Sequence, residues 1–436
     1  MKKVVIVGGG WAGSSAALAA AKAGADVVLL ERMDALLGTG LVGGIMRNNG
    51  RFTAAEEMIA LGGGDMFSCT DAVSRHKGIE FPDHKHASLY DIYKIEPLIK
   101  ETLLEAGVDV RLQTPFSDVE MDGQRIKAVS TAGEDKEVFE GDVFIDTTGT
   151  CGPTRNCTKY GNGCVMCVIR CPSFGPRVSL AGKAGVAELV AKKKDGSLGA
   201  MSGSCKLQKD SLAPHIIEEL DRTGVCVVPL PPEDYKGDVL DKKACQQYAT
   251  KSFAENIILL DTGPAKLMSP YFALDKLRKI SGFENARYED PYSGGLGNSM
   301  RYFAMSPRTN ELKVEGVDNL FCAGEKAGPL VGHTEAISTG TLAGYNAVRH
   351  AHGLELLTLP TDLAVGDAIA YVKEQMQTEE GIRLKYTFSG SVYFSRMKEL
   401  GLYTTDIEAI QDRVAKAGLT GIFSKKASEY KTVVVD

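Results

Sequence analysis

The first thirty-two residues contain the pattern that most restricts how this chain can fold. The β-branched run Val4–Val7 leads directly into Gly8–Gly13, which has the spacing G-x-G-x-x-G. The alanine-rich segment Ser14–Ala23 predicts a helix, and Ala25–Leu30 predicts a second strand that ends at Glu31. A buried strand, a tight glycine turn, a helix and a second strand in this order are typical of a dinucleotide-binding parallel sheet.

The glycines of this turn have separate physical roles. Gly8 permits the tight turn, Gly10 lets the backbone approach a pyrophosphate, and Gly13 lets the helix pack closely on the strand. The free N–H groups and the positive dipole end of the helix suit phosphate. Glu31 lies 23 residues after Gly8, where a carboxylate accepts hydrogen bonds from ribose hydroxyls, and Arg32 follows it. We therefore predict that these five residues bind a dinucleotide.

Two later segments extend this site. Residues 142–146 predict a strand that exits sharply into Thr147-Thr148-Gly149, and a second apolar strand ends in Gly324-Glu325. Residues 340–347 predict a helix with small residues on its packing face. A carboxylate and a helix N-terminus near the flavin suit a large FAD site built from both halves of the chain. Thr148, Gly149, Gly324 and Glu325 are therefore further candidates for cofactor binding.

Longer stretches resemble the GidA-type FAD flavoproteins, the family of the tRNA-modifying enzymes MnmG and TrmFO. Residues 43–66 (GGIMRNNGRFTAAEEMIALGGGDM) resemble an MnmG segment. Residues 280–292, 320–347 and 359–372 resemble TrmFO. The resemblance covers most of the chain and implies FAD bound at the glycine turn, at Glu31 and at Gly149, Gly324 and Glu325.

The same resemblance adds Gly43 and Gly44 to the cofactor site. It also implies that His333 lies near the flavin, either as an acid/base group or as a donor to the FAD phosphates. The tRNA enzymes have a functional cysteine in the region that corresponds to residues 38–42, and this chain has none there.

Half of the ten cysteines lie in residues 151–172, CGPTRNCTKYGNGCVMCVIRCP. The ending C-x2-C-x3-C-P resembles the end of a ferredoxin ligand run, which predicts a [4Fe–4S] cluster. Its metal ligands would be Cys157, Cys164, Cys167 and Cys171. A redox dithiol of Cys164 and Cys167, a structural zinc on the same four cysteines and an unreactive loop remain alternatives. Because the stretch directly follows Gly149, we expect it to begin close to the FAD.

Composition limits the partners. The net charge is −6 and the pI is near 5.8, so no overall basic field favours nucleic acid, and RNA is an unfavoured partner. The apolar N-terminal run breaks at three glycines, and no long uncharged apolar run occurs, so we expect a cytoplasmic protein without a membrane span. No second strand–GxGxxG–helix unit appears. The electron donor or acceptor is therefore expected to be a transient small molecule or another protein, and a homo-oligomer is left open.

These observations predict an α/β protein with a Rossmann-like, glutathione-reductase-like FAD-binding domain, an inserted α+β domain and a small helical C-terminal module. The FAD domain would comprise residues 1–150 and 306–350, the inserted cysteine-containing substrate domain residues 151–305, and the module residues 355–436. Within the module, Thr405-x-x-Glu408 predicts a capping box.

The function that follows is an FAD-dependent oxidoreductase that passes electrons between flavin and the cysteine site, with Cys164, Cys167 and His333 as catalytic candidates. The alternatives are a folate- and FAD-dependent enzyme that modifies tRNA or rRNA uridines, and a flavin electron-transfer subunit.

Two further pairs of residues are candidates. His84 and His86 are predicted to lie on the surface or at the rim of the active site, with metal or substrate binding as the alternative. Arg301 and Arg308 either clamp an anionic substrate or solvate a loop.

Overall fold

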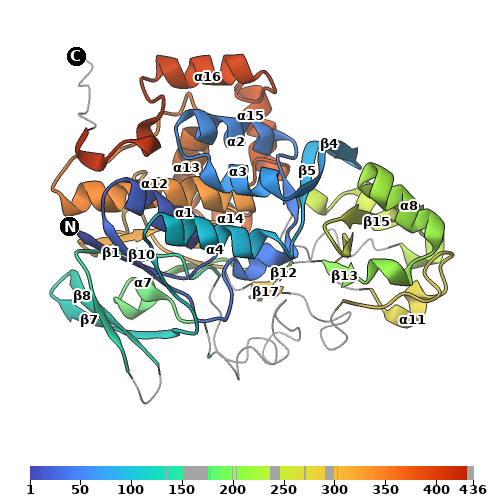
Figure 1. The fold of residues 1–436 in the computed structure, drawn as a ribbon, viewed down its shortest axis with the longest axis horizontal. Helices are drawn as coiled ribbons and strands as arrows, with labels where there is room; N and C mark the ends of the chain where they lie inside the picture. The colour runs from blue at the N-terminus through green and yellow to red at the C-terminus, as the bar shows by residue number, and fades with distance from the viewer. Residues whose placement is uncertain are drawn as a thin grey trace.

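The fold is that of a computed structural model, which describes residues 1–132, 136–150, 175, 177–198, 200–202, 204–235, 246–269, 272–289, 299–301 and 303–429. Figure 1 shows a large α/β body, a lobe at one end built from green and yellow segments, and orange and red helices on top of the body.

A parallel sheet of five strands forms the centre of the body. In sheet order the strands are β19 (Leu320–Cys322), β10 (Val143–Asp146), β1 (Lys3–Val7), β2 (Asp26–Leu30) and β6 (Asp109–Arg111). β1 is apolar and almost wholly buried, as expected of a strand covered on both faces. Because the strands are parallel, the carboxyl ends of β1, β2, β10 and β19 lie at the same edge of the sheet.

Helices α1 (Trp11–Lys22) and α12 (His333–Ala351) pack against each other beside this sheet. They approach so closely that a Cβ added at Gly340 would lie 2.2 Å from the Ala12 carbonyl oxygen. A Cβ at Gly344 would lie equally close to the carbonyl oxygen of Ala16. The N-terminal helix and the helix that begins at His333 are thus joined by backbone-to-backbone packing that only glycine permits.

Smaller sheets flank the central one. One is an antiparallel β-meander of β7 (Phe116–Asp122), β8 (Arg125–Thr131) and β9 (Val138–Glu140). A second antiparallel sheet has the order β3 (Ile45–Met46), β5 (His84–Tyr90) and β4 (Ser74–Phe81). The helices between these strands are α2 (Gly50–Ala60), α3 (Asp65–Ala72) and α4 (Ile95–Glu105), and the 3-10 turn η1 covers Gly38–Val42.

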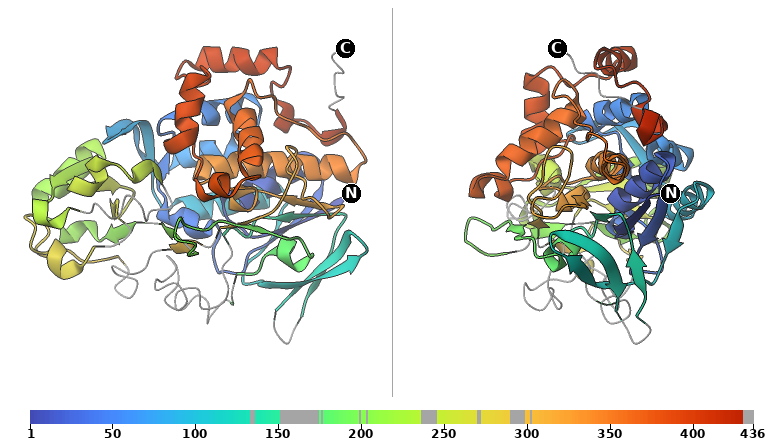
Figure 2. Two further views of the ribbon diagram at one scale, coloured as in Figure 1. Left: turned by 180° about the vertical axis from the view of Figure 1, so that it is seen from behind. Right: turned by 90° about the vertical axis from the view of Figure 1, so that its left-hand side faces the viewer.

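The lobe has its own antiparallel sheet and its own hydrophobic core (Figures 1 and 2). In sheet order its strands are β13 (Cys205–Leu207), β16 (Ala265–Leu267), β15 (Asn256–Asp261) and β14 (Val225–Pro229). Helices α8 (Pro214–Thr223) and α11 (Leu274–Leu277) accompany this sheet.

Short elements complete the region between the lobe and the body. They are α7 (Leu180–Lys183), α10 (Lys251–Glu255), the 3-10 turn η4 (Gln246–Tyr248), the strand pair β11 (Leu189–Val190) and β18 (Ala304–Met305), and the pair β12 (Ala200–Ser202) and β17 (Ser299–Arg301).

The C-terminal helices are α13 (Ala364–Gln375), α14 (Glu379–Arg383), α15 (Ser391–Glu399) and α16 (Ile407–Lys416). Of these, α13 and α16 dock on α2, whose buried Glu57 accepts hydrogen bonds from the N–H groups of Ala364 and Val365 at the start of α13. The predicted capping box is wrong. Asp406 is the N-cap of α16, and its carboxylate accepts from the Ala409 N–H, because the helix begins one residue later than the box requires.

The parallel sheet and its covering helices confirm the predicted Rossmann-like α/β fold class. The predicted division into domains stays a prediction. None of the helices in the described ranges is both long and apolar enough to cross a membrane.

Candidate functional site

A cavity with about 1720 Å³ of empty space, counting its open mouth, lies at the carboxyl ends of β1, β10 and β19. In open α/β sheets, ligands bind outside the carboxyl ends of the strands. The cavity extends from Glu31 and Phe116 at one end to His333 and Lys266 at the other. Its walls come from both halves of the predicted FAD domain and from the lobe.

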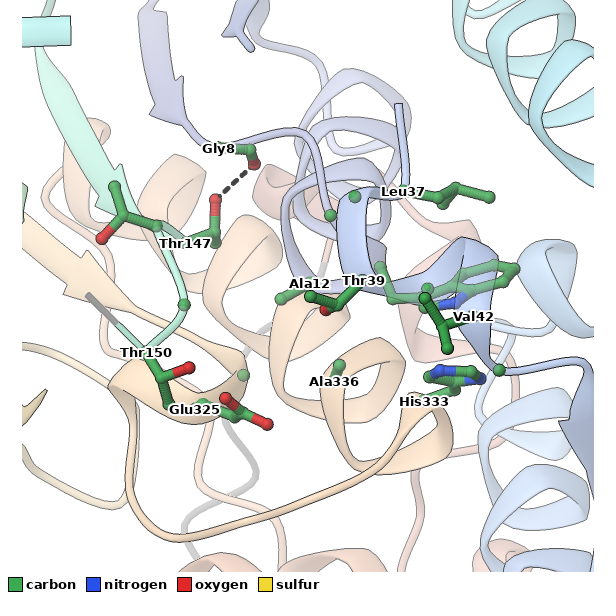
Figure 3. A pocket seen from close by; sticks show the side chains of 18 of the residues that line it. Gly8, Ala12, Leu37, Thr39, Val42, Thr147, Thr150, Glu325, His333 and Ala336 are labelled. Atoms are coloured by element: carbon green, nitrogen blue, oxygen red, sulfur yellow. Dashed lines mark hydrogen bonds between the residues drawn. The ribbon is translucent and has the colours of Figure 1, made fainter. Parts of the chain in front are cut away.

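The glycine turn forms one wall, and each glycine has a distinct environment. Gly8 has a φ of +106°, and its carbonyl oxygen accepts a 2.7 Å hydrogen bond from Thr147 Oγ1 (Figure 3). A Cβ at Gly13 would lie 1.8 Å from the same oxygen, so Gly13 is a packing position. A Cβ at Gly10, by contrast, would meet nothing within 4 Å, and Gly10 lines the cavity. The backbone at Gly10 is thus open to a ligand at the N-terminus of α1.

Glu31 lines the cavity at the end of β2 and also organises the turn. Its two carboxylate oxygens accept hydrogen bonds from the Gly9 N–H (2.7 Å) and the Met33 N–H (2.9 Å). Burial raises the pKa of Glu31, although these two bonds favour the charged form. The Arg32 guanidinium donates to the Gly175 carbonyl, and Thr114 and Phe116 line the same end of the cavity. This end fits an adenosine ribose.

The second predicted set lies beside the glycine turn, since an added Cβ at Gly8 would lie 3.1 Å from the Cα of Thr148. Thr148 donates from its hydroxyl and its N–H to one Asp146 oxygen, at 2.7 and 3.0 Å. Gly149 and Gly324 both have positive φ angles, and the side chains of Thr150 and Glu325 lie near each other in Figure 3. All of these except Asp146 line the cavity.

His333 begins α12 at the far end of the cavity, and its ring lies beside Val42 in Figure 3. A Cβ at Gly43 would lie 1.6 Å from Cε1 of this ring, so only glycine fits there. His333 Nδ1 is 3.3 Å from the Tyr90 hydroxyl, which also donates to the Gly40 carbonyl at 3.1 Å. The sequence predicted His333 and Gly43 at this site, but it gave no signal for Tyr90.

The lobe supplies the remaining wall of the cavity. The lobe contributes Ser204, Lys266 and Met268, and the adjoining 3-10 turn η4 contributes Gln247 and Tyr248. Lys266 is buried on β16, and its Nζ donates to the Val42 carbonyl and, at 2.7 Å, to Ser204 Oγ. Sequence reasoning missed all five, because no local motif marks them. Lys266 is directed to the cavity only by the register of the lobe sheet.

The predicted cysteine site, formed by Cys157, Cys164, Cys167 and Cys171, lies outside the described residues. The residues that flank it are described, and Thr150, Arg177 and Val178 all line the cavity. The Arg177 guanidinium donates to the Thr150 carbonyl at 3.3 Å. The described residues that flank the cysteine-bearing segment on its two sides therefore lie at the cavity. In the part of the chain that the structure describes, no group of three or more His, Cys, Asp or Glu side chains could hold a metal ion.

Several candidates lie elsewhere. Gly44 does not line the cavity and packs instead against Thr262. The prediction of a surface or rim position is wrong for His84, which is buried and stacks on Phe81 with ring centroids 4.7 Å apart. His86 is partly buried.

Arg308 is not a substrate clamp, because it is buried and donates to the carbonyls of Ala327 and Ile369. The side chain of Arg301 lies outside the described part of the chain.

The residues present fit FAD. The open face of Gly10 at a helix N-terminus suits a pyrophosphate, and Glu31 lies on one side of it as a ribose acceptor would. At the far end, the buried carbonyl oxygen of the Gln247 side chain lines the cavity and has no hydrogen-bond partner among the described residues. A buried acceptor of this kind calls for an N–H donor from a ligand.

Comparison with known proteins adds independent findings. Residues 3–152 match a family model described as FAD dependent oxidoreductase, and residues 266–355 match that of glucose inhibited division protein A. A methylenetetrahydrofolate–tRNA-(uracil-5-)-methyltransferase TrmFO from Caldicellulosiruptor bescii is 35% identical over 98 residues, 22% of this chain and 21% of that protein. The TrmFO of Symbiobacterium thermophilum is 36% identical over 99 residues, with the same coverage. The matched segment spans about a fifth of these curated relatives.

Among solved structures, two crystal forms of Aquifex aeolicus GidA have a TM-score of 0.59 at 16% identity. They cover 95% of this chain and 76% and 78% of the GidA chain. At this identity the likeness shows the fold alone.

Proposed function

Because this chain is related to the GidA-type FAD flavoproteins, we propose that it is an oxidoreductase that passes electrons between FAD and a redox site on its own cysteines. The observation that carries the proposal is the cavity at the strand ends, which runs from the buried carboxylate of Glu31 past the open face of Gly10 to His333. Its dimensions and its polar groups suit a dinucleotide with a second ring system at the far end.

Under this proposal the chain binds FAD through distinct groups along the cavity. The backbone at Gly10 and the N-terminus of α1 bind the pyrophosphate, and Glu31 accepts the ribose hydroxyls. Bound FAD supplies a carrier that accepts and returns two electrons. Tyr90 fixes the ring of His333 against Gly43, where this ring would hold or release a proton during the transfer.

The proposed redox partner is the cysteine-bearing segment, and the contact between Arg177 and Thr150 supports it, because these two residues flank the segment and both line the cavity. Closing a disulfide between Cys164 and Cys167 would release two electrons and two protons, which matches a two-electron carrier. A [4Fe–4S] cluster on Cys157, Cys164, Cys167 and Cys171 is the other redox form of the proposal. A zinc ion on the same cysteines would leave them without a redox role.

The decisive experiment uses protein purified without oxygen. Its visible spectrum is recorded before and after dithionite, and iron and zinc are counted per chain. Flavin bands over a broad bleachable shoulder, with about four irons, support the cluster. Flavin bands with neither metal, together with thiols that reduce the flavin, support the dithiol.

A matched pair of variants identifies the cysteines involved. Cys164→Ser should remove the iron or the thiol reactivity, whereas Cys226→Ala should retain it, because Cys226 is buried in the separate core of the lobe. Protein that holds no FAD, or that holds zinc with no thiol chemistry, would contradict the proposed function.

A second candidate is folate- and FAD-dependent modification of RNA uridines. The family match over residues 266–355 and the TrmFO relatives favour it. The test incubates the chain with unmodified tRNA, methylenetetrahydrofolate and a reductant, with a reaction lacking folate as the control. A folate-dependent methyluridine detected by mass spectrometry supports this candidate, and its absence under conditions where a TrmFO methylates the same tRNA contradicts it.

The electron donor remains part of the proposal. We expect either a small molecule such as NADH or NADPH that binds transiently, or a protein. Turnover of the purified chain with a nicotinamide would support an independent enzyme, whereas turnover only with a protein donor would support a flavin electron-transfer subunit. Light scattering on the same sample would test for a homo-oligomer.

A further inference from the structure

The end of the cavity opposite Glu31 contains a buried lysine that belongs to the lobe and reaches the body. Lys266 lies on β16, an interior strand of the lobe sheet, and is 5% exposed. Its Nζ donates to the carbonyl of Val42, in the 3-10 turn η1 of the body, and to Ser204 Oγ in the lobe. Two hydrogen bonds from opposite sides therefore fix the ammonium group where it lines the cavity.

The position of Lys266 is linked to the N-terminus of α12. Lys266 binds Val42, and the next residue, Gly43, packs against the ring of His333 at the start of α12. The N-terminus of a long helix carries a partial positive charge. The neighbouring Arg51 is paired with Glu335 at 3.1 Å, so that pair adds little net charge. A lysine and a helix N-terminus thus give this end of the cavity a positive potential.

A second observation at the same wall concerns Gln247. Its side-chain carbonyl oxygen is buried, lines the cavity and has no hydrogen-bond partner among the described residues. Its backbone is held in place, because the Gln247 carbonyl lies 3.2 Å from His84 Nε2. A ligand edge that suits this wall therefore presents an N–H to Gln247 and electron-rich oxygen or nitrogen atoms to the positive charge of Lys266.

The pyrimidine edge of a flavin has this pattern, with one ring N–H between two carbonyl groups. We propose that Lys266 and Gln247 bind the pyrimidine edge of FAD, and that the lysine stabilises the reduced cofactor. This inference rests on the proposed function, since Glu31 would bind the adenosine ribose and leave the flavin at the far end. Two electrons and one proton from the electron donor leave one negative charge on the pyrimidine ring, and the ammonium of Lys266 offsets that charge.

The test compares the wild type with Lys266→Met, Lys266→Arg and a control, Lys276→Met, in the FAD-loaded full chain. Lys276 lies in the lobe, but its side chain is 60% exposed and pairs with Asp234, and neither residue lines the cavity. The readouts are the midpoint potential of the bound FAD and the affinity for sulfite, which adds to oxidised flavin and leaves a negative charge on the ring. Neither readout requires the natural substrate.

Lys266→Met should bind sulfite at least about tenfold more weakly and should lower the potential by about 30 mV for a two-electron couple, the equivalent of about a tenfold change. Lys266→Arg should stay within about threefold of the wild type because it keeps the charge, and Lys276→Met should not differ from the wild type. An unchanged potential in Lys266→Met, or an equal loss of affinity for oxidised and reduced FAD, would overturn the inference.

Two further results distinguish a variant that does not fold, an incorrect inference and an incorrect proposed function. If circular dichroism shows that Lys266→Met does not fold, Ser204→Ala decides, because it removes one anchor of the ammonium while retaining the charge. Weaker sulfite binding by Ser204→Ala supports the inference, and wild-type behaviour overturns it. A wild-type chain that binds no FAD refutes the proposed function and this inference with it, whereas normal FAD binding with unchanged potentials refutes the inference alone.

Discussion

Substituting alanine at two neighbouring glycines of the N-terminal turn should separate cofactor binding from packing. Gly10 has φ −70° and ψ −174°, which any residue can adopt, and an added Cβ would meet nothing within 4 Å. Gly13 is three residues away, and its added Cβ would lie 1.8 Å from the Gly8 carbonyl oxygen. The same methyl group therefore enters open cavity space at one position and backbone at the other.

The expected magnitudes differ in the FAD-free protein. Gly10→Ala should change the free energy of unfolding by less than about 1 kcal/mol, because the lower entropy of the unfolded chain is offset by the poorer capping of alanine at this N-cap position. Gly13→Ala gains about 1 kcal/mol in helix propensity. It loses about 1–3 kcal/mol through overpacking, and the clash with rigid backbone favours the upper value. We expect a net loss of about 1–2 kcal/mol.

Urea unfolding of the FAD-free variants and fluorescence titration with FAD measure the two effects. Gly10→Ala should weaken FAD binding at least about tenfold, or about 1.4 kcal/mol, because the methyl group occupies the approach of the pyrophosphate. Wild-type affinity for FAD in Gly10→Ala would refute the assignment of this face to the cofactor. A Gly13→Ala protein as stable as the wild type would refute the packing argument.

Three further predictions concern stability. Glu335→Gln should lower the free energy of unfolding in urea by about 3–5 kcal/mol, because it leaves the buried guanidinium of Arg51 without its carboxylate. The double variant Arg51→Met, Glu335→Leu should lose less, because it removes both charges. Burial lowers the pKa of Lys385 to about 7, so the unfolded chain binds more protons than the folded chain above that pH. The free energy of unfolding of the wild type should therefore rise from about pH 7 to about pH 10, and this rise should be absent in Lys385→Met. Asp406→Ala should cost about 1 kcal/mol in thermal unfolding, whereas Thr405→Ala should be nearly neutral, because Asp406 is the N-cap of α16.

The sequence was sufficient for the central sheet and the cofactor turn because their signals are local. Val4–Val7 is a continuous β-branched run, as a strand buried on both faces requires, and the turn that follows is fixed by the positive φ of Gly8 and the packing of Gly13. Glu31 could be found by spacing alone, because it directly follows the neighbouring strand β2. The same reasoning located Gly43 and His333 only through their resemblance to a family.

The lobe wall of the cavity could not be predicted in this way. Lys266 reaches the cavity because β16 pairs with β13 and β15 in one register, in which Leu267 lies opposite both Cys205 and Leu259. A shift by one residue would turn its side chain to the other face. His84 differs from its prediction for a related reason. A polar residue in an alternating segment can point inward when it finds a hydrogen-bond partner there, and Asn48 Nδ2 donates to His84 Nδ1 at 3.0 Å.

The order of strands in the central sheet also has a consequence for synthesis on the ribosome. β10 ends at Asp146, but its outer neighbour β19 begins only at Leu320, and α12, which interlocks with α1, follows at His333. At roughly 5–20 residues per second, the hydrogen-bonding edge of β10 waits roughly 10–35 s for its partner while the lobe emerges. During that interval the edge is a site for mispairing between nascent chains. Slow translation at low temperature should therefore lower the yield of cofactor-competent protein, and an early supply of FAD would not prevent this.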